Sequence, residues 1–344
     1  LFNNKAAVIE LNNGLNDEKL IILKQLAKMK KHNIFTPKGK ETKHRFTLQE
    51  IKSLLKETNE ENIKYLEQLA QKTEKLSGDR ENSFSSSEIL RVLECINSGN
   101  EKIAKQLIDI TEIRPTEIER LTECLKNTTQ DNVDIWQILL STRQKGGKTE
   151  LNLASLSSLA KKVEETQNPK CAEVILNAEK KNGTGTYIYD IDDVLSILPK
   201  LKEENADIYR QFHELKSVSE IKSNKCASLL PAINQHNIGM VDTILSKTHA
   251  GSTQVIFSDY NNIKEVLEAI NKDNKDLAEE LLKLIKTKYC IAGRYSSTDK
   301  TLIEVLNKTR DTSQREKANN ILNTNSIRDF DHFVSLFFKP DSAI

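Results

Sequence analysis

The chain has 344 residues, of which 29% are charged and 37% are hydrophobic, and its formal net charge is +1. No apolar run approaches the roughly 18 residues of a membrane-spanning helix, so the sequence predicts a soluble protein without membrane insertion. The high charged fraction is typical of a fold with thin walls and much exposed surface, which grows by adding units and not by enlarging one core.

Residues 1–45 are predicted to contain part of a repeat followed by a basic loop. Residues 8–26 match the apolar and Asn positions of the second half of residues 263–285, and the chain opens with Leu, so we expect a fragment of a longer protein or a processed product. The loop from 28 to 45 is cationic, with only Glu41 opposing. It is interpreted either as a solvated loop or as a binding loop for an acidic partner or a phosphate backbone. Its candidate binding residues are Lys28, Lys30, Lys31, Phe35, Lys38 and Lys40.

Residues 46–326 carry a repeat in which an apolar-then-Asn pattern returns about every 38 residues. Each repeat is aligned on one apolar anchor residue. The anchors are Ile51, Ile89, Ile118, Leu156, Val194, Cys226, Ile263 and Leu302. Apolar residues three, four and seven places after the anchors form the stripe of an amphipathic helix. A period of this size predicts stacked helical hairpins, and hence an all-α, right-handed α-solenoid of about eight two-helix repeats.

An Asn stands eleven residues after most anchors, where the second helix of the hairpin is expected to begin. The set comprises Asn62, Asn100, Asn205, Asn237 and Asn274, with Asn168 one place later and Ser313 in the last repeat. Because Asn accepts hydrogen bonds from the free amides of a first helical turn, these residues are interpreted as N-caps. The alternative is a row of ligand-binding Asn side chains.

The starts of several first helices are also marked. Capping-box spacing occurs at Thr47 with Glu50 and at Ser85 with Glu88, and the pair Asp190 and Asp193 approximates it. Pro115 suits a first helical turn. An apolar residue five places before most anchors is expected to pack over the helix end; these residues are Phe46, Phe84, Ile113, Leu151, Tyr189 and Ile221.

Three loops that follow second helices carry short β-prone runs, at residues 187–189, 255–257 and 289–291. They predict brief extended fingers along one edge, or else segments that seal the junctions between hairpins. If the fingers project, their aromatic and cationic residues are candidate contacts for a partner, because tyrosine offers a large contact area at small entropic cost. These candidates are Tyr187, Tyr189, Tyr289, Arg294 and Tyr295.

Residues 327–344 depart from the repeat. Phe330, Phe333, Val334, Phe337 and Phe338 follow helical spacing, which predicts a capping helix packed on the last hairpin. The alternative is a hydrophobic face for a partner or for further repeats.

The sequence carries no pattern that indicates catalysis. The six His show no metal-binding spacing, and Gly183 and Gly185 lack the strand and helix context of a phosphate loop. Five Cys without CxxC spacing indicate free thiols and favour a reducing compartment such as the cytoplasm. We therefore expect no enzyme, no cofactor and no metal.

The pattern resembles the α-solenoid families in general, HEAT-like or tetratricopeptide-like, because its period falls between theirs. None of their signature strings is present, so the resemblance covers nearly the whole chain but is architectural only. It implies a scaffold with a long concave surface and assigns no functional residue. The abundance of Lys, Asn and Ile is typical of AT-rich coding genomes and favours a bacterial source.

Two functions remain open. The first is a non-enzymatic scaffold that binds a protein or peptide along its second helices or its loop edge. The second is a nucleic-acid-binding helical repeat. Exposed positions five places after the anchors, such as Lys56, Glu94, Glu123 and Lys161, alternate in sign, whereas a phosphate-following track is uniformly cationic. The sequence thus favours a protein partner.

Overall fold

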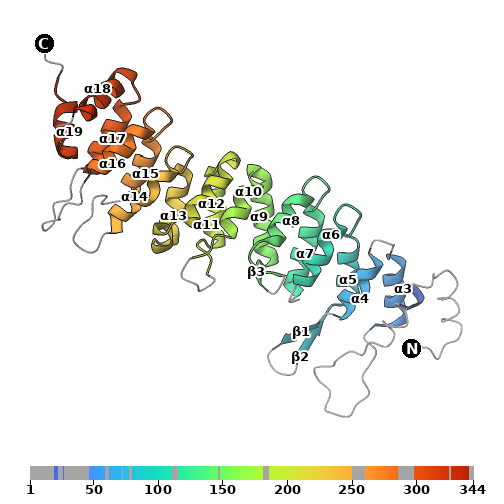
Figure 1. The fold of residues 1–344 in the computed structure, drawn as a ribbon. Coiled ribbons are helices and arrows are strands. Elements are labelled where there is room, and N and C mark those ends of the chain that lie inside the picture. The colour runs from blue at the N-terminus through green and yellow to red at the C-terminus, as the bar shows by residue number, and fades with distance from the viewer. Residues whose placement is uncertain are drawn as a thin grey trace. The chain divides into compact units, whose positions relative to one another are not determined.

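The computed structural model describes residues 19–21, 26, 46–58, 62–71, 73–76, 80–110, 115–145, 148–180, 186–249, 260–285, 298–324 and 327–340. Helices dominate this part of the chain, and its strands are confined to two short hairpins, so the predicted all-α class is confirmed (Figure 1). None of the helices described combines the length and apolarity needed to cross a bilayer.

The chain divides into two compact units, residues 1–164 and 165–344. The first unit contains the helices α3 (Leu48–Lys56), α4 (Ile63–Gln71), α5 (Ser86–Leu93), α6 (Glu101–Ile110), α7 (Pro115–Asn127), α8 (Val133–Ser141) and the start of α9 (Leu153–Thr166). Its strands are β1 (Thr73–Leu76), β2 (Arg80–Ser83), β3 (Gln144–Lys145) and β4 (Lys148–Thr149).

The second unit contains α10 (Pro169–Leu176), α11 (Ile191–Ile197), α12 (Ala206–Glu214), α13 (Ser223–Leu229), α14 (Ile238–His249), α15 (Tyr260–Ala269), α16 (Lys275–Leu284), α17 (Thr298–Lys308), α18 (Thr312–Asn323) and α19 (Phe330–Phe337). Four 3-10 turns extend or connect them: η1 (Leu198–Lys200), η2 (Glu203–Asn205), η3 (Ser217–Glu220) and η4 (Leu230–Ala232).

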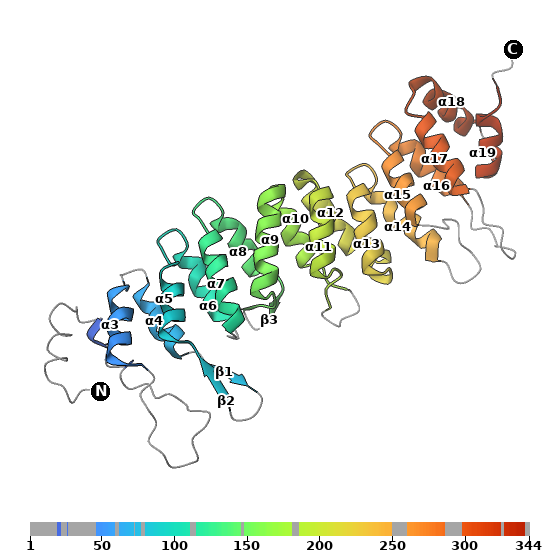
Figure 2. The ribbon, with the colours of Figure 1, turned by 180° about the vertical axis from the view of Figure 1, so that it is seen from behind.

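Within each unit the helices pack in two layers. First helices contact first helices of the next hairpin, as α5 does with α3 and α7, or α13 with α11 and α15. Second helices contact second helices, as α6 does with α8, or α12 with α10 and α14 (Figures 1 and 2). The apolar stripe of each helix is buried between the layers; Ile51, Val92 and Leu267 are fully buried examples. This arrangement places equivalent positions of successive second helices beside one another.

The helix-start signals are confirmed. The Glu50 amide donates to Thr47 Oγ1 at 3.2 Å while the Thr47 amide donates to Glu50 Oε2 at 2.7 Å, and Ser85 with Glu88 forms the same capping box. Asp190 accepts from the Asp193 amide at 2.7 Å, and α7 begins at Pro115. The apolar residues expected over the helix ends are buried at positions 46, 84, 151, 189 and 221, whereas Ile113 lies outside the described residues.

The interpretation of the Asn side chains as N-caps is wrong. Asn168 and Asn274 do hold the N-cap position of their helices, but neither of these described side chains makes a capping hydrogen bond. Asn237 shows what the side chain does instead. Its Nδ2 donates to the carbonyl of Ala232 in its own hairpin at 2.8 Å and to the carbonyl of Leu267 in the next hairpin at 2.9 Å. Its Oδ1 accepts from the Asn234 amide at 2.9 Å.

The same cross-hairpin bond recurs along both units. We call the residues that make it the asparagine ladder: Asn62 to the Leu93 carbonyl, Asn100 to Leu125, Asn168 to Leu198, Asn237 to Leu267 and Asn274 to Leu306, at 2.9–3.2 Å. The ladder side chains are buried. Asn100, Asn237 and Asn274 each also accept a hydrogen bond from a backbone amide. A buried amide bonded in this way loses little on desolvation, so the ladder ties hairpin to hairpin at little energetic cost.

The third and the last repeats vary this pattern. Each bonded Leu carbonyl lies four residues after its anchor except in the third repeat, where Leu125 lies seven residues after Ile118. Ile118 is the fourth residue of its helix, as Ile51, Ile89 and Leu156 are of theirs. In the last hairpin the helix is capped by Asp311, whose side chain accepts from the Ser313 and Gln314 amides, so Ser313 is not the cap.

Before the first complete hairpin, Lys19 makes the kind of bond that a ladder Asn makes elsewhere. Its Nζ donates to the Leu55 carbonyl at 2.8 Å and to the Thr58 carbonyl at 2.7 Å. Leu55 lies four residues after the anchor Ile51, as most bonded Leu residues of the ladder do. Residues 19–21 are helical and Leu26 is buried, while the rest of the predicted partial repeat and basic loop lies outside the described residues.

The extended segments among the described residues lie in loops after second helices. β1 pairs with β2 and β3 with β4, both antiparallel, and Glu179 forms a bridge with Tyr187. Of the finger predicted at residues 187–189, only Tyr187 takes part in this extended pairing. Ile188 and Tyr189 are buried and seal the junction between hairpins. The runs at 255–257 and 289–291 lie outside the described residues.

The C-terminal helix α19 packs on α18 and buries Phe330, Phe333 and Phe337. Cys95, Cys124, Cys171 and Cys226 are free and buried, as expected for small core residues. Burial raises the pKa of the Cys124, Cys171 and Cys226 thiols to about 12.

Candidate functional site

A cavity of about 370 Å³ lies in the first unit between α6 and α8, next to the β3–β4 hairpin. We call it the first hollow. Its lining residues are Gln106, Asp109 and Ile110 of α6, Gln137, Leu140 and Ser141 of α8, and Gln144 and Thr149 of the hairpin. The lining is mostly uncharged and rich in side chains that both donate and accept hydrogen bonds.

A cavity of about 350 Å³ lies in the second unit between α10 and α12, and we call it the second hollow. Its lining residues are Glu173, Val174 and Asn177 of α10, Ala178 and Glu179 of the loop that follows, and Arg210, His213 and Glu214 of α12. The finger that begins at Glu179 lies beside it, because Glu179 pairs with Tyr187.

The two hollows occupy the same place in the repeat. In the first hollow Asp109 lies nine residues after Asn100, and in the second Asn177 lies nine residues after Asn168. On the facing helices, Leu140 lies eight residues after Asn132 and His213 lies eight after Asn205. Gln106 corresponds to Val174, Gln137 to Arg210 and Ser141 to Glu214, whereas Glu173 has no counterpart in the lining of the first hollow. The hollows are therefore a property of the hairpin geometry and not an accident of one loop.

The last hairpin repeats the feature. A groove of about 710 Å³ on α18 is lined at Lys317, Asn320 and Ile321, which lie six, nine and ten residues after the cap Asp311. Leu336 of α19 lines its other side. The same positions of a second helix thus line a groove here too, although the facing helix is α19, which follows the last hairpin, and not the second helix of another hairpin.

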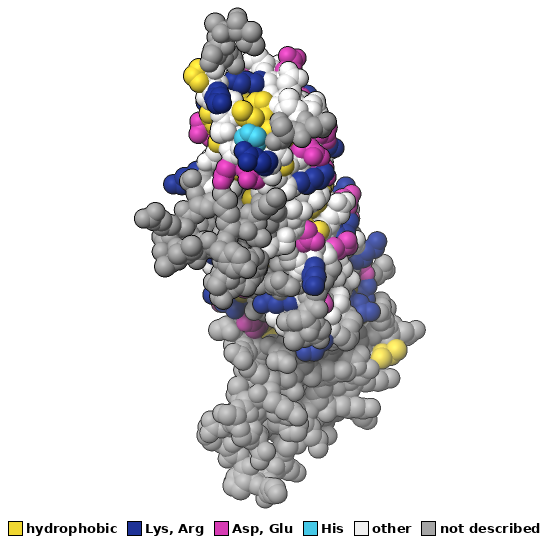
Figure 3. Space-filling model, turned by 60° about the vertical axis from the view of Figure 1, so that its left-hand side comes forward, with side chains coloured by type: hydrophobic (Ala, Val, Ile, Leu, Met, Phe, Trp, Pro, Cys, Tyr) yellow, Lys and Arg dark blue, Asp and Glu magenta, His cyan; other side chains and the backbone are white. Residues whose placement is uncertain are grey.

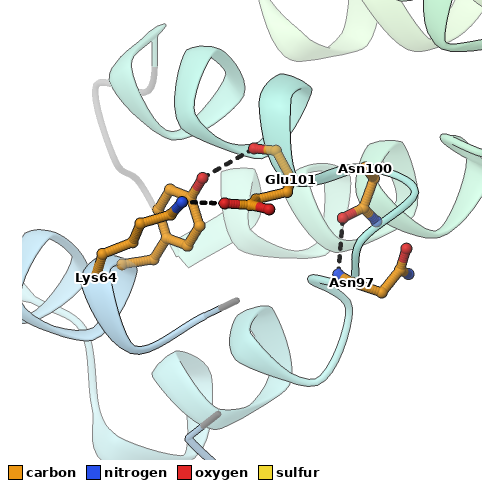
Figure 4. Close-up of polar contacts among 5 residues, drawn as sticks. Lys64, Asn97, Asn100 and Glu101 are labelled. Carbon is orange, nitrogen blue, oxygen red and sulfur yellow. Dashed lines mark hydrogen bonds and ion pairs between the residues drawn. The ribbon is translucent and has the colours of Figure 1, made fainter. Parts of the chain in front are cut away.

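At other junctions side chains fill this place. Between α4 and α6, Gln68 donates to Asp109 at this place. At the starts of the same two helices, beside the ladder, Lys64 pairs with Glu101 and the Tyr65 hydroxyl donates to the Glu101 carbonyl at 2.8 Å (Figure 4). Figure 4 also shows the Asn97 amide donating to the ladder residue Asn100, which directly precedes Glu101.

Between α12 and α14 the 3-10 turn η3 takes the equivalent space. The Ser217 hydroxyl and amide both donate to Asp242. Whether a junction is open or closed therefore depends on a few side chains at fixed repeat positions.

His213 forms part of the wall of the second hollow. It is only 8% exposed, and burial lowers the pKa of its imidazole to about 3, so the ring is neutral. Its Nε2 lies 2.8 Å from the Tyr189 hydroxyl, and burial raises the pKa of that phenol well above its usual value. Its Nδ1 has no hydrogen-bond partner among the residues that the structure describes.

The hollows differ in charge. The first contains one carboxylate, Asp109, and no cation among its lining residues. The second contains Glu173, Glu179 and Glu214 against Arg210, whose guanidinium pairs with Asp207 at 2.6 Å. On the face that Figure 3 shows, cationic and acidic side chains are interspersed over the described residues. That mixture differs from the uniformly cationic track that follows phosphates.

Of the residues predicted from sequence as contacts, two lie in the described part. Tyr187 is half-buried beside the second hollow, while Tyr189 is 1% exposed and hydrogen bonded to His213, so its ring supports the wall and is not a surface contact. Lys28, Lys30, Lys31, Phe35, Lys38, Lys40, Tyr289, Arg294 and Tyr295 lie outside the described residues.

Sequence reasoning did not identify the hollow residues. A signal was present in the positions counted from each Asn, because residues six, eight and nine places after it line the hollows, whereas the comparison of charge used positions counted from the anchors. In the described ranges no three His, Cys, Asp or Glu side chains gather as a metal site requires. Neither a protein-family model, nor a curated protein, nor a solved structure matches the chain.

Proposed function

We propose that the chain is a right-handed α-solenoid of about eight two-helix repeats that acts as a non-enzymatic scaffold, binding an extended segment of a partner protein in the hollows between its second helices. The observation that carries this proposal is the recurrence of a hollow at the same repeat positions between α6 and α8 and between α10 and α12.

The chemistry of the hollows suits a peptide. A hollow of 350–370 Å³ is at the small end of ligand sites and accommodates one or two side chains. Gln106, Gln137 and Ser141 offer donors and acceptors to backbone amides and carbonyls, while Ile110 and Leu140 offer apolar surface. Rigid helices hold these groups, which lowers the entropic cost of binding.

The alternative, a nucleic-acid-binding repeat, has less support. The second hollow is rich in carboxylates, which repel phosphates, and the first hollow contains an Asp. A protein partner is therefore the function that the geometry favours.

The proposal is tested by filling the first hollow. Ser141 is exposed on α8 and lines the hollow, so Ser141→Tyr places a ring in it with little effect on folding. A phage library of random twelve-residue peptides is selected on the full chain, and the affinities of the binders are measured by fluorescence anisotropy. We expect Ser141→Tyr to weaken at least one class of binder about tenfold or more.

The matched control is Gln130→Tyr, an exposed position in the turn at the opposite end of the same hairpin. It adds the same aromatic surface outside the hollow, and we expect binding to stay within about twofold of wild type. Equal loss in both variants, or a selection that yields no binder, would overturn the proposal.

A further inference from the structure

The closed junctions show which kind of group fills the place that the first hollow leaves open. Between α4 and α6 a side-chain amide fills it, because Gln68 of the earlier helix donates to Asp109 of the later one. Between α12 and α14 Ser217 fills it, and its hydroxyl and backbone amide both donate to Asp242. At both junctions the occupant is therefore an uncharged hydrogen-bonding group.

The first hollow repeats the α4–α6 junction without that contact. Gln106 occupies the repeat position of Gln68, six residues after a ladder Asn. Ser141 occupies the position of Asp109, nine residues after the Asn of its hairpin. Gln106 makes no hydrogen bond to any residue that the structure describes, and the Ser141 hydroxyl donates to the Ile138 carbonyl of its own helix at 2.7 Å. The space that Gln68 fills at one junction is thus open at the next, and an amide supplied by a ligand fits it.

The charges of the lining favour a neutral ligand. Gln137 stands at the position that Asp242 holds in the closed α12–α14 junction, five residues after the Asn. A carboxylate only accepts hydrogen bonds, whereas the amide of Gln137 both donates and accepts. An anionic ligand would meet Asp109 with no cation in the lining to offset it, and a cationic ligand would meet one carboxylate that already accepts from Gln68. The lining is therefore complementary to a neutral group that also donates and accepts.

Three elements hold these groups around an apolar surface. Gln106 comes from α6, Gln137 from α8 and Gln144 from the β3–β4 hairpin. The Gln144 Nε2 donates to the Leu140 carbonyl, which fixes the side chain and leaves its Oε1 as an acceptor. Leu140, only 5% exposed, and the half-buried Ile110 supply the apolar part of the lining. Methylene groups that end in an amide match this combination.

We propose that the first hollow binds the carboxamide side chain of an Asn or Gln residue of the partner segment. Gln106 and Gln137 exchange hydrogen bonds with the amide, and Ile110 and Leu140 pack on its methylene groups. This inference rests on the proposed function, since it names the side chain that one of the hollows selects. A site built from amides rejects a residue of the same size that lacks the amide, because its own polar groups then lose their partners.

The experiment uses the peptides selected on the full chain from the random twelve-residue library. We expect Asn or Gln to be enriched at one position of those binders that Ser141→Tyr weakens. In the strongest of them, replacing that residue by the acid of the same size, or by Leu, should weaken binding about tenfold. A backbone amide of the segment offers similar chemistry, and the Leu replacement keeps the backbone. Unchanged affinity after that replacement would assign the contact to the backbone and overturn the proposal.

A variant of the hollow tests the same contact from the side of the protein. Gln106→Leu/Gln137→Leu keeps side-chain size and removes two amides at exposed positions, and we expect it to weaken the amide-bearing peptide about tenfold. Combining it with the Leu-substituted peptide gives a double-mutant cycle, whose coupling reports a direct contact. The matched control, Gln130→Leu/Gln211→Leu, makes the same change at exposed positions outside the lining of both hollows. Its binding should stay within about twofold of wild type.

The outcomes distinguish this inference from the proposed function. Binders that respond to Ser141→Tyr but show no preference for Asn or Gln, or no coupling to Gln106 and Gln137, would overturn the inference and leave the proposed function standing. A selection without any binder would overturn both. Far-UV circular dichroism of each variant checks its folding. If the double variant does not fold, Gln144→Leu on the exposed part of the hairpin takes its place in the cycle.

Discussion

The two ends of the second helices differ in their polar side chains: one end repeats a single hydrogen-bonded residue, and the other does not. At the turn before the second helix, the asparagine ladder uses the same residue in five hairpins, and each of its buried amides donates to a carbonyl of the next hairpin. At the far ends of α6 and α8, and of α10 and α12, the corresponding positions carry different residues and leave a hollow.

The contrast shows which part of a repeat is constrained by structure. A ladder Asn must donate twice and accept once in a buried space, and few side chains other than Asn have that geometry. The hollow positions face open space, so their side chains can differ without loss of stability. Repetition therefore indicates structural residues, and variation at equivalent positions indicates residues available for recognition.

The largest expected effect comes from breaking the ladder. Asn237→Ala removes the buried donor to the Ala232 and Leu267 carbonyls and leaves the Asn234 amide without its acceptor. We expect the free energy of unfolding to fall by about 2–4 kcal/mol in urea titrations followed by circular dichroism.

The matched change is Asn205→Ala, at a half-buried position that also precedes a second helix. Its cost should stay below about 1 kcal/mol. If the two variants lose equal stability, the cross-hairpin bond of Asn237 is not what stabilises the array.

The next effect concerns the imidazole that distinguishes the two hollows. Because burial lowers the folded-state pKa of His213 to about 3, only the unfolded chain binds this proton between about pH 6.5 and pH 3. Wild-type stability should therefore fall by up to about 1.4 kcal/mol for each pH unit below 6.5, on account of this group alone. The stability is fully present above the unfolded pKa and is lost on acidification.

His213→Leu removes that term and makes the second hollow resemble the first. Unfolding free energies measured from pH 7 to pH 4 should converge for variant and wild type, or cross, as the pH falls. Parallel curves would mean that the imidazole is solvated and protonates freely in the folded state.

The smallest effect comes from opening a closed junction. Gln68 is half-buried and donates to Asp109 between α4 and α6, so Gln68→Ala removes one bridge at a solvent-accessible site. We expect a loss of about 0.5 kcal/mol, measured by urea unfolding. A loss as large as that of Asn237→Ala would show that this end of the hairpin is structural as well, and the contrast between the two ends would fail.

Much of the helical fold could be predicted from the sequence, because its signals are local. The capping boxes at Thr47 and Ser85 and the Pro at the start of α7 depend on residues three or four places apart, and all three are confirmed. The carbonyl that Asn100 bonds did not follow from the spacing, because α7 runs for 13 residues and Leu125 lies seven residues, and not four, after Ile118.

The site could not be predicted in the same way. Tyr187 was identified correctly as part of an extended segment, but Tyr189, two residues later, points into the core and bonds His213, 24 residues away. The pattern of aromatic residues does not distinguish the two, since both occupy a β-prone run. Only the packing of α12 against this segment decides which ring is buried.

The sequence by itself determined the helices, their order and the position of the Asn at each turn, because helix periodicity and capping are encoded within about eleven residues. Tertiary structure decided what those Asn residues do and where the hollows lie. A side-chain amide bonds the nearest unsatisfied groups, and for Asn100 one of these is the Leu125 carbonyl, 25 residues away. A local sequence pattern cannot predict a bond between residues so far apart in the chain, because the bond forms only when one hairpin packs on the next.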